Sequence, residues 1–280
     1  MPKIAIVDKM HQDGINLLKN IPKFECEIIE DLSKENLISK LPNFDGITLR
    51  RGKIDAEILG KCKNLKVISR HGVGYDNIDT KILKEKKISL LVTGTTASVS
   101  PVEHIMFMIL NISKSFNLFD KSVRDGKFDT VMHMKHESFE LFGKKILIAG
   151  FGRIGKQLIK RCLGFEMKVY AYDPFVDKKV IEKLGGKKIN NLEEGLKEAD
   201  ILSLSVPLTK DTYNMINLEK MKKMKKTSII INTSRGGVIN ENDLNTALDK
   251  EIIYGAGLDV FEKEPPNKDN PLLINKKVIL

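Results

Sequence analysis

Three glycines and one acidic residue in the second half of the chain have the types and spacing of a nucleotide-binding turn. Gly150, Gly152 and Gly155 follow the apolar run Lys-Ile-Leu-Ile-Ala, and Asp173 ends a second apolar run eighteen residues after Gly155. Strand, glycine turn, helix, second strand and terminal acid together form the full context of a dinucleotide site. We expect Gly150 to permit a tight turn, Gly152 to admit a pyrophosphate, and Gly155 to let helix and strand pack closely.

The acid at the end of the second strand also indicates which dinucleotide is bound. The helix after the glycines offers unpaired N–H groups and the positive end of its dipole to the phosphates. A carboxylate at Asp173 can accept hydrogen bonds from the adenosine ribose hydroxyls and repels a 2′-phosphate, which favours NAD over NADP. Lys178 and Lys179 lie close enough in the sequence to keep NADP open as the alternative.

Composition is that of a soluble globular protein. The chain has 280 residues, a hydrophobic content of 41% and a formal net charge of +10, which allows one large domain or two. Its lysines are scattered among acidic residues without a basic stripe interleaved with aromatics, so we expect no nucleic-acid partner. The longest apolar stretch, Ile105–Leu110, is too short to span a bilayer, and the N-terminus does not resemble a signal peptide, so no membrane partner is expected.

The three cysteines favour a reducing compartment. Cys26, Cys62 and Cys162 are far apart, odd in number and without a CxxC motif or metal-ligand spacing. Such residues are typical of small buried apolar positions rather than of disulfides or metal sites. We therefore expect a cytoplasmic protein with no metal.

Short β-branched runs alternate with helical stretches, a pattern typical of parallel sheets with helices on both faces. Predicted strands cover 4–7, 25–29, 46–49, 66–69 and 89–92 in the first half, and 146–149, 168–171, 201–205, 228–232, 253–258 and 277–280 in the second. We therefore predict an α/β protein with two doubly wound parallel-sheet domains. Between the halves, Val99–Arg124 is predicted to be one long helix, apolar on more than one face, and burial of that surface in an interdomain or dimer contact favours a homodimer.

Ordered blocks along nearly the whole chain resemble the D-isomer-specific 2-hydroxyacid dehydrogenases, in particular the phosphoglycerate dehydrogenase branch. The blocks are Asp45–Arg50, Leu65–Asp79, the glycine turn, Val206–Thr209, Ile231–Gly237 and Leu258–Pro265. The resemblance implies a flavodoxin-like substrate domain over 1–97, lacking its usual C-terminal return helix, and a Rossmann NAD-binding domain over 98–280. It places the active site in the cleft between them and implies NAD as the cofactor.

The resemblance also implies roles for residues that contact the substrate. Arg235 would hold the substrate carboxylate and keto oxygen, a task that suits a planar guanidinium. Glu264 would orient the family's catalytic histidine. The remaining substrate-binding positions are Arg50 and the backbone amides of Gly72, Val73 and Gly74, with Arg51 and Lys53 adding charge. Without the resemblance, these residues would be interpreted as a surface arginine, a loop acid and a generic tight turn.

Cofactor contacts follow from the same resemblance. Arg153 and Ile154 would cap the pyrophosphate, and Asp259 would hold the nicotinamide carboxamide. The other implied contacts are Val206 and Pro207, which flank the cofactor, and Thr233, Ser234 and Arg235, which line its nicotinamide side.

The family's catalytic histidine lies in a Thr-Pro-His block after the strand that begins at Lys277, and the chain stops at Leu280. None of the five histidines present is a convincing substitute, and His104 is interpreted as structural; the five are His11, His71, His104, His133 and His136. Ala97 stands where the family often has asparagine. We therefore expect a fragment of an active enzyme, with turnover near background for residues 1–280.

The expected function is NAD-dependent oxidation of the CH–OH group of D-2-hydroxy acids, with 3-phosphoglycerate and phosphohydroxypyruvate as the favoured pair. The Arg50–Arg51 pair is the feature that favours a phosphorylated acid. Two alternatives remain open: a glyoxylate or hydroxypyruvate reductase, and a truncated protein that binds NAD without catalysis.

Overall fold

The computed structural model describes residues 1–94, 98–129 and 138–280. They form two compact α/β units, Met1–Ala97 and Ser98–Leu280. The two domains predicted from the sequence have the same bounds, and their assignment as substrate and cofactor domains remains a prediction at this point.

The first unit is a five-stranded, all-parallel sheet with the strand order β2-β1-β3-β4-β5. Its elements are β1 (Lys3–Val7), α1 (Gln12–Lys19), β2 (Glu25–Ile29), α2 (Lys34–Lys40), β3 (Gly46–Leu49), α3 (Ala56–Lys61), β4 (Val67–Arg70), α4 (Thr80–Glu85) and β5 (Ser89–Val92), with a 3-10 turn, η1 (Leu41–Asn43). The strand order reverses between β1 and β3, and ligands of such sheets bind at the carboxyl ends of the strands beside this point.

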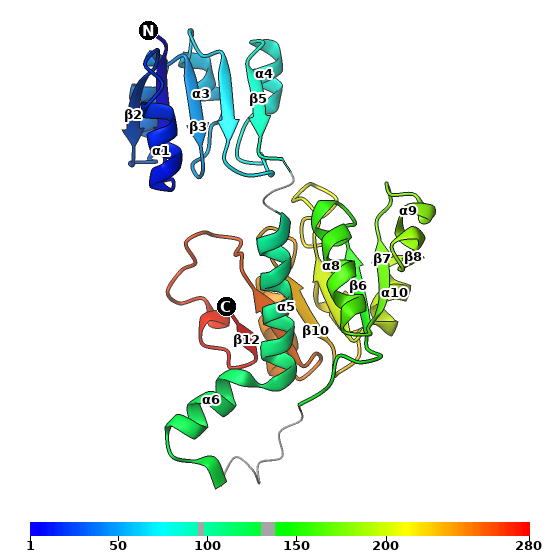
Figure 1. Ribbon diagram of the computed structural model, residues 1–280. Coiled ribbons are helices and arrows are strands. Elements are labelled where there is room, and N and C mark those ends of the chain that lie inside the picture. The colour runs from blue at the N-terminus through cyan, green and yellow to red at the C-terminus, as the bar shows by residue number, and fades with distance from the viewer. Residues whose placement is uncertain (95–97, 130–137) are drawn as a thin grey trace. The chain divides into compact units, whose positions relative to one another are not determined.

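The second unit is a seven-stranded parallel sheet with the order β12-β11-β10-β9-β6-β7-β8 (Figure 1). Its helices are α5 (Val99–Lys114), α6 (Phe116–Arg124), α8 (Arg153–Gly164), α9 (Lys178–Lys183), α10 (Leu192–Glu198), α11 (Leu218–Met221) and α12 (Glu241–Asp249), with a 3-10 turn, η3 (Pro271–Leu273). Its strands are β6 (Lys145–Ala149), β7 (Lys168–Tyr172), β8 (Lys187–Ile189), β9 (Ile201–Leu204), β10 (Ile229–Asn232), β11 (Gly255–Leu258) and β12 (Val278–Ile279).

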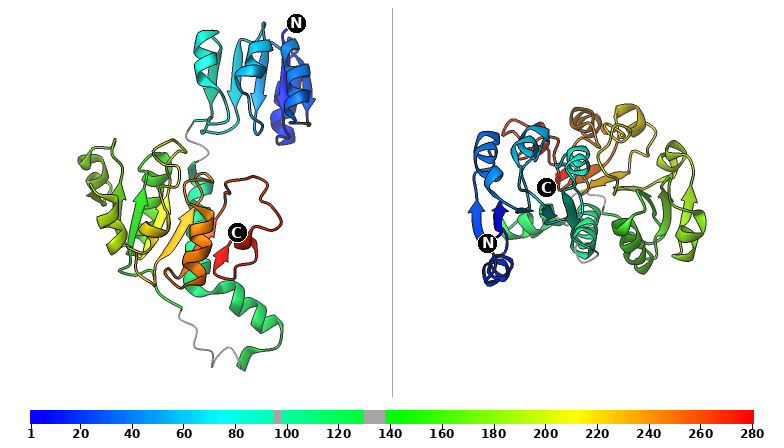
Figure 2. Two further views of the ribbon diagram at one scale, coloured as in Figure 1. Left: turned by 180° about the vertical axis from the view of Figure 1, so that it is seen from behind. Right: turned by 90° about the horizontal axis from the view of Figure 1, so that it is seen from above.

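Helices cover both faces of the second sheet because its strands are apolar on both sides. Ile146 and Ile148 of β6 pack in one buried cluster with residues of α5 and α8, whereas Leu147 and Ala149 pack in the other cluster with α10, α11 and α12. Figures 1 and 2 show α5 and α8 on one side of the sheet and α12 on the other. The prediction of two doubly wound parallel sheets is confirmed.

The prediction of one long helix over Val99–Arg124 is wrong. The segment forms α5 and α6, separated at Ser115, whose φ of +49° and ψ of +39° are left-handed. A left-handed residue ends the helical hydrogen-bond ladder and redirects the chain. Most of the apolar residues of α5 are buried, whereas α6 has no buried residue.

The predicted strands agree with the observed ones apart from small shifts at their ends and one omission. Strand β11 begins at Gly255 rather than at Ile253. Strand β8 was not predicted, because its three residues, Lys-Lys-Ile, carry a single apolar side chain. It pairs with β7 at the edge of the sheet, where short and charged strands are common.

Candidate active site

The glycine turn lies where the strand order of the second sheet reverses. Strands β6 and β9 are neighbours although two strands separate them in the sequence, and ligands of doubly wound sheets bind outside such a point. Gly150 directly follows β6 with a φ of +92°. A Cβ at this position would lie 2.5 Å from the carbonyl oxygen of Ser205, which follows β9. Only glycine permits both this backbone conformation and this approach of the two chain segments.

The other two glycines differ in what surrounds them. Gly152 is the N-cap of α8, and a Cβ there would have no atom within 4 Å; no side chain caps this helix. The space beside Gly152 at the N-terminus of α8 is therefore open, as an anion site at a helix N-terminus requires. Gly155 is buried, and a Cβ there would lie 2.6 Å from the Gly150 carbonyl oxygen. Positions 150 and 155 therefore have the steric need for glycine expected from the sequence, and the role of Gly152 toward a pyrophosphate stays a prediction.

Asp173 lies at the carboxyl end of β7 and is tied to the glycine turn. Its Oδ2 accepts a hydrogen bond of 2.8 Å from the backbone N–H of Phe151, and its Oδ1 accepts one of 2.9 Å from Phe175. The carboxylate is half-buried, and each oxygen retains a further lone pair for another donor. Lys178 and Lys179 are exposed in the first turn of α9, and Lys178 lies 3.5 Å from Glu182.

The turn after β10 is held by the side chain of Asn232. Its Oδ1 accepts hydrogen bonds from the backbone N–H and the hydroxyl of Ser234, and its Nδ2 donates to the Arg235 carbonyl oxygen at 3.0 Å. The Arg235 guanidinium is half-buried and donates to the Ser234 carbonyl oxygen at 2.6 Å. Thr233 Oγ1 is buried and makes no hydrogen bond within the described residues, which leaves a donor for a ligand.

The turn that carries Arg235 abuts the loop that carries Glu264. A Cβ at Gly236 would overlap the backbone carbonyl of Phe261, so the two segments touch through their main chains. Glu264 is exposed, and its Oε1 accepts a hydrogen bond of 3.2 Å from the Phe261 N–H. The structure thus brings the segments of the two predicted catalytic residues together, although the residues are far apart in the sequence.

The loop after β9 completes this edge of the sheet. The Val206 side chain lies 2.9 Å from the position of a Cβ on Gly150, and the Pro207 carbonyl oxygen accepts a hydrogen bond of 2.6 Å from the Thr212 hydroxyl. Tyr213 donates a hydrogen bond of 2.9 Å to Glu262 Oε1 in the loop after β11. This bond to a carboxylate raises the pKa of the Tyr213 hydroxyl, so the tyrosine remains a donor.

One histidine lies beside a predicted cofactor residue. His104 Nε2 lies 3.5 Å from Asp259 Oδ1, so a residue interpreted as structural contacts a predicted cofactor ligand. His11 pairs with Asp13 at 3.4 Å. Within the described residues, no histidine makes a hydrogen bond or ion pair with Glu264. His133, His136 and Ala97 lie outside those residues.

In the first unit, Arg51 does not add free charge beside Arg50. Its guanidinium donates to both carboxylate oxygens of Asp8, at 2.7 and 3.0 Å, and Asp8 is almost fully buried. Hydrogen bonding to Arg51 is the main reason that the pKa of Asp8 lies below its usual value. Arg50 is exposed, donates to the Lys9 carbonyl oxygen at 3.2 Å, and remains accessible to an anion.

The glycine loop after β4 offers two amides rather than three. The Gly72 N–H donates to the Arg70 carbonyl oxygen at 2.9 Å, whereas the amides of Val73 and Gly74 donate to no group within the described residues. The Arg70 guanidinium lies over Gly72 and donates to the His71 carbonyl oxygen. The expected nest for a carboxylate is therefore reduced to Val73 and Gly74, beside a guanidinium.

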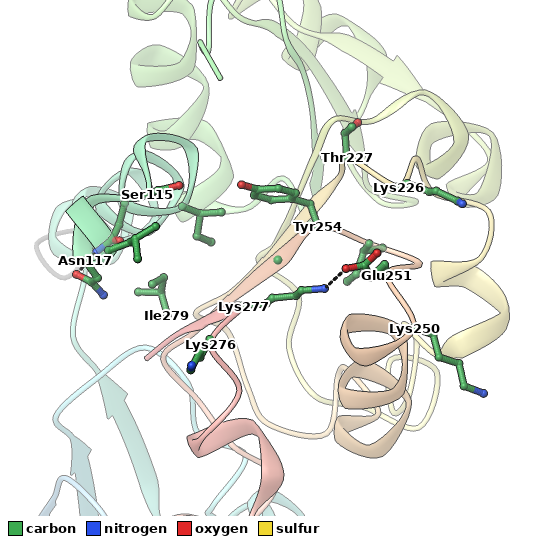
Figure 3. A pocket seen from close by; sticks show the side chains of 15 residues that line it. Ser115, Asn117, Lys226, Thr227, Lys250, Glu251, Tyr254, Lys276, Lys277 and Ile279 are labelled. Atoms are coloured by element: carbon green, nitrogen blue, oxygen red, sulfur yellow. Dashed lines mark hydrogen bonds and ion pairs between the residues drawn. The ribbon is translucent and has the colours of Figure 1, made fainter. Parts of the chain in front are cut away.

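A cavity of about 480 Å³ opens at the opposite, amino edge of the second sheet (Figure 3). Thr227 before β10, Tyr254 before β11 and Lys277 before β12 line it, and Lys277 Nζ lies 3.2 Å from Glu251 Oε1. It contains none of the predicted site residues, so it is separate from the glycine turn.

Comparison with known proteins identifies the family. Residues 106–280 match the model of the D-isomer specific 2-hydroxyacid dehydrogenase, NAD binding domain. A D-3-phosphoglycerate dehydrogenase of Methanocaldococcus jannaschii is 39% identical over all of this chain and 52% of its own length. A glyoxylate reductase of Thermococcus onnurineus is 38% identical over 94% of this chain and 80% of its own. The solved PH0520 protein of Pyrococcus horikoshii has a TM-score of 0.83 and 31% identity, covering all of this chain and 84% of that one.

The chain belongs to the D-isomer specific 2-hydroxyacid dehydrogenase family, and its second unit contains the family's NAD-binding domain. The resemblance inferred from the sequence and the choice of NAD are thereby confirmed. The chain spans about half the length of the D-3-phosphoglycerate dehydrogenases that it matches. No helix within the described residues is long and apolar enough to cross a membrane.

Proposed function

We propose that the protein containing this chain is an NAD-dependent dehydrogenase that interconverts a D-2-hydroxy acid and its 2-keto acid. The observation that carries the proposal is that the glycine turn after β6, the turn of Arg235 after β10 and the loop of Glu264 after β11 all lie at the carboxyl edge of the second sheet, where β9 separates β6 from β10. Gly150 touches the segment after β9, and Gly236 touches the loop after β11. One ligand at this edge could therefore contact all three segments.

The residues of the second unit fit NAD. Open space at Gly152 beside the N-terminus of α8 suits a pyrophosphate, and Asp173 at the end of β7 suits the ribose hydroxyls. The unpartnered hydroxyl of Thr233 suits the nicotinamide side. The proposed cofactor contacts are Gly150, Gly152, Arg153, Ile154, Gly155, Asp173, Val206, Pro207, Thr233, Ser234, Arg235 and Asp259.

In the proposed reaction, the bound cofactor would accept a hydride from the substrate C2 as NAD⁺ in oxidation and return it as NADH in reduction. Arg235 donates parallel hydrogen bonds to the carboxylate and the keto oxygen, and its positive charge stabilises the negative charge that develops on that oxygen. Glu264 orients the histidine that the family resemblance implies, which gives the proton to the same oxygen during reduction and takes it back during oxidation. Hydride and proton are both needed to balance the conversion.

For the substrate, we propose 3-phosphoglycerate and phosphohydroxypyruvate first. Arg50 is exposed at the carboxyl end of β3, and the amides of Val73 and Gly74 lie after the neighbouring β4. A guanidinium suits a phosphate, and the two amides suit a carboxylate. The name of the Methanocaldococcus relative agrees. The engagement of Arg51 by Asp8 favours a second candidate, glyoxylate or hydroxypyruvate, which needs less positive charge and agrees with the name of the Thermococcus relative.

Calorimetric titration of residues 1–280 with NADH and NADPH tests the cofactor assignment. We expect NADH to bind about tenfold tighter or more, because Asp173 repels a 2′-phosphate. Asp173→Asn keeps an acceptor for the Phe151 N–H but removes the charge, so the preference should shrink severalfold. Absence of heat with NADH, or equal affinity of the unmodified chain for both dinucleotides, would contradict the proposal.

The proposal includes a homodimer in a reducing, cytoplasmic compartment. Phe116 and Val123 form an apolar stripe along α6, and their exposures are 55% and 49%. Covering such a stripe with a second copy would remove apolar surface from water. The three cysteines are free, and burial raises the pKa of the Cys162 thiol to about 12, so it remains a thiol.

Sedimentation equilibrium tests the dimer. We expect the chain to be dimeric at micromolar concentration and Val123→Lys to shift it toward the monomer, because the substitution places a charge in the stripe. Lys121→Gln on the same helix is the matched control and should leave the mass unchanged. A monomeric unmodified chain would exclude this assembly.

A further inference from the structure

We propose that His104 is a positioning residue for cofactor recognition: it holds the Asp259 carboxylate in the orientation that receives the amide group of the nicotinamide carboxamide. The inference rests on the proposed cofactor role of Asp259. Its basis is the way that α5 lies on β11, which places His104 beside Asp259.

Two contacts fix the register of α5 on β11. A Cβ at Gly255 would lie 3.4 Å from Ile112 Cγ2, and a Cβ at Gly257 would lie 2.9 Å from Met108 Sδ. Both strand residues are glycines, so the helix packs directly against the strand backbone. Moving along β11 from Gly255 to Gly257, the contacting helix residue changes from Ile112 to Met108. The strand and the helix therefore run in opposite directions.

The next step of this register is the pair formed by His104 and Asp259. Four residues of α-helix advance about 6 Å and two residues of strand advance about 6.6 Å, so consecutive contacts stay aligned over this short distance. Residues 104, 108 and 112 lie on one helix face. The proximity of His104 to Asp259 therefore follows from backbone packing and does not depend on one side-chain rotamer.

The side chains complete the arrangement. His104 Nε2 lies 3.5 Å from Asp259 Oδ1, and the two side chains are 36% and 54% exposed, so a ligand can reach them. The imidazole stacks on Phe107 with ring centroids 6.0 Å apart and an interplanar angle of 12°, which limits the orientation of the ring. The Asp259 N–H donates to the Asn232 carbonyl oxygen at 3.0 Å, which fixes the backbone of the acid beside the turn of Arg235.

The two carboxylate oxygens of Asp259 have different surroundings. Oδ1 faces His104, whereas Oδ2 makes no hydrogen bond or ion pair among the described residues. An N–H from His104 on Oδ1 restrains rotation of the carboxylate, so Oδ2 meets an amide donor at a smaller cost in side-chain entropy. His104 would then affect only those ligands that carry the amide.

A comparison of three ligands isolates this effect. NAD carries the carboxamide, 3-acetylpyridine adenine dinucleotide replaces its amino group by methyl, and ADP-ribose lacks the nicotinamide ring. We expect His104→Ala to weaken NAD binding about threefold, the worth of a partly exposed hydrogen bond, and to leave the affinities for the other two ligands unchanged. His104→Gln retains an N–H donor of similar reach and should restore most of the affinity for NAD.

Two further variants complete the test. Asp259→Asn should weaken NAD binding more than His104→Ala, and the double variant should be no weaker than Asp259→Asn alone, because His104 acts through the acid. Glu103→Gln, on the same helix turn but paired with Arg161 at 3.8 Å, is the matched control and should bind all three ligands normally.

The outcomes separate this inference from the proposed function. If His104→Ala lowered the affinities for NAD and ADP-ribose equally, or lowered neither, the positioning role of His104 would be wrong. The proposal that the chain binds NAD would be unaffected. If the unmodified chain bound neither NAD nor ADP-ribose, the proposed function itself would be wrong. Normal NAD binding by Asp259→Asn would show that the acid has no role in cofactor recognition.

Discussion

Gly150→Ala is expected to lower the free energy of unfolding by about 2–4 kcal/mol and to remove measurable NADH binding. The Cβ would lie 2.5 Å from the carbonyl oxygen and 2.6 Å from the carbonyl carbon of Ser205, and these are backbone atoms that cannot move independently. The φ of +92° adds strain for any residue with a side chain. Because the turn lies where strands β6 and β9 meet, relief of the overlap would displace the proposed phosphate-binding segment itself. Urea denaturation and NADH fluorescence measure the two effects.

Gly152→Ala is the matched control, and we expect it to weaken NADH binding without lowering stability. At Gly152 a Cβ would have no neighbour within 4 Å, and φ is −75°. The free energy of unfolding should therefore change by less than about 1 kcal/mol. NADH binding should still weaken about tenfold or more, because the methyl group fills the space left for the pyrophosphate. If Gly152→Ala binds NADH normally, or if Gly150→Ala is as stable as the unmodified chain, the roles assigned to the two glycines are wrong.

The parts of the fold that the sequence predicts are those set by local pattern. Apolar runs such as 146–149 and 229–232 are buried on both faces, and this doubly apolar character distinguishes central parallel strands. The glycine turn was predictable because its glycines lie in one local sequence motif, in which Gly150 and Gly155 stand where a Cβ would overlap backbone atoms. The end of the long helix was not, because the left-handed residue is Ser115 and not a glycine or asparagine, which usually mark such a stop.

Side-chain pairs at the edges of the sheets could not be predicted from the sequence, for a different reason. The pairs His104–Asp259 and Arg51–Asp8 depend on the register of a helix on a strand and on strand adjacency, which no local pattern encodes. A weak signal existed for the second pair: an acid follows β1 and arginines follow the neighbouring β3. For the first pair, the signal was Gly255 and Gly257, two glycines on one face of a strand that admit a closely packed helix.

Arg235→Lys is expected to lower kcat/KM by about 10²–10³ in the gene product that contains this chain. Lysine keeps the charge but cannot present two parallel N–H donors, one to the carboxylate and one to the keto oxygen. The turn itself should survive, because Asn232 binds the backbone of residue 235 and not its side chain. NADH oxidation with phosphohydroxypyruvate and with hydroxypyruvate measures the effect.

Comparison of the two substrates in this assay also tests which anion the arginine holds. Both carry the same 2-keto acid group, so Arg235→Lys should lower kcat/KM by the same factor for each. Arg50→Gln should instead impair the phosphorylated substrate more, since Arg50 is proposed to contact the phosphate. Arg124→Lys, on exposed α6 and paired with Asp120 at 2.9 Å, is the control and should leave both rates unchanged. A rate for Arg235→Lys within fivefold of the unmodified enzyme would contradict the bidentate role of Arg235.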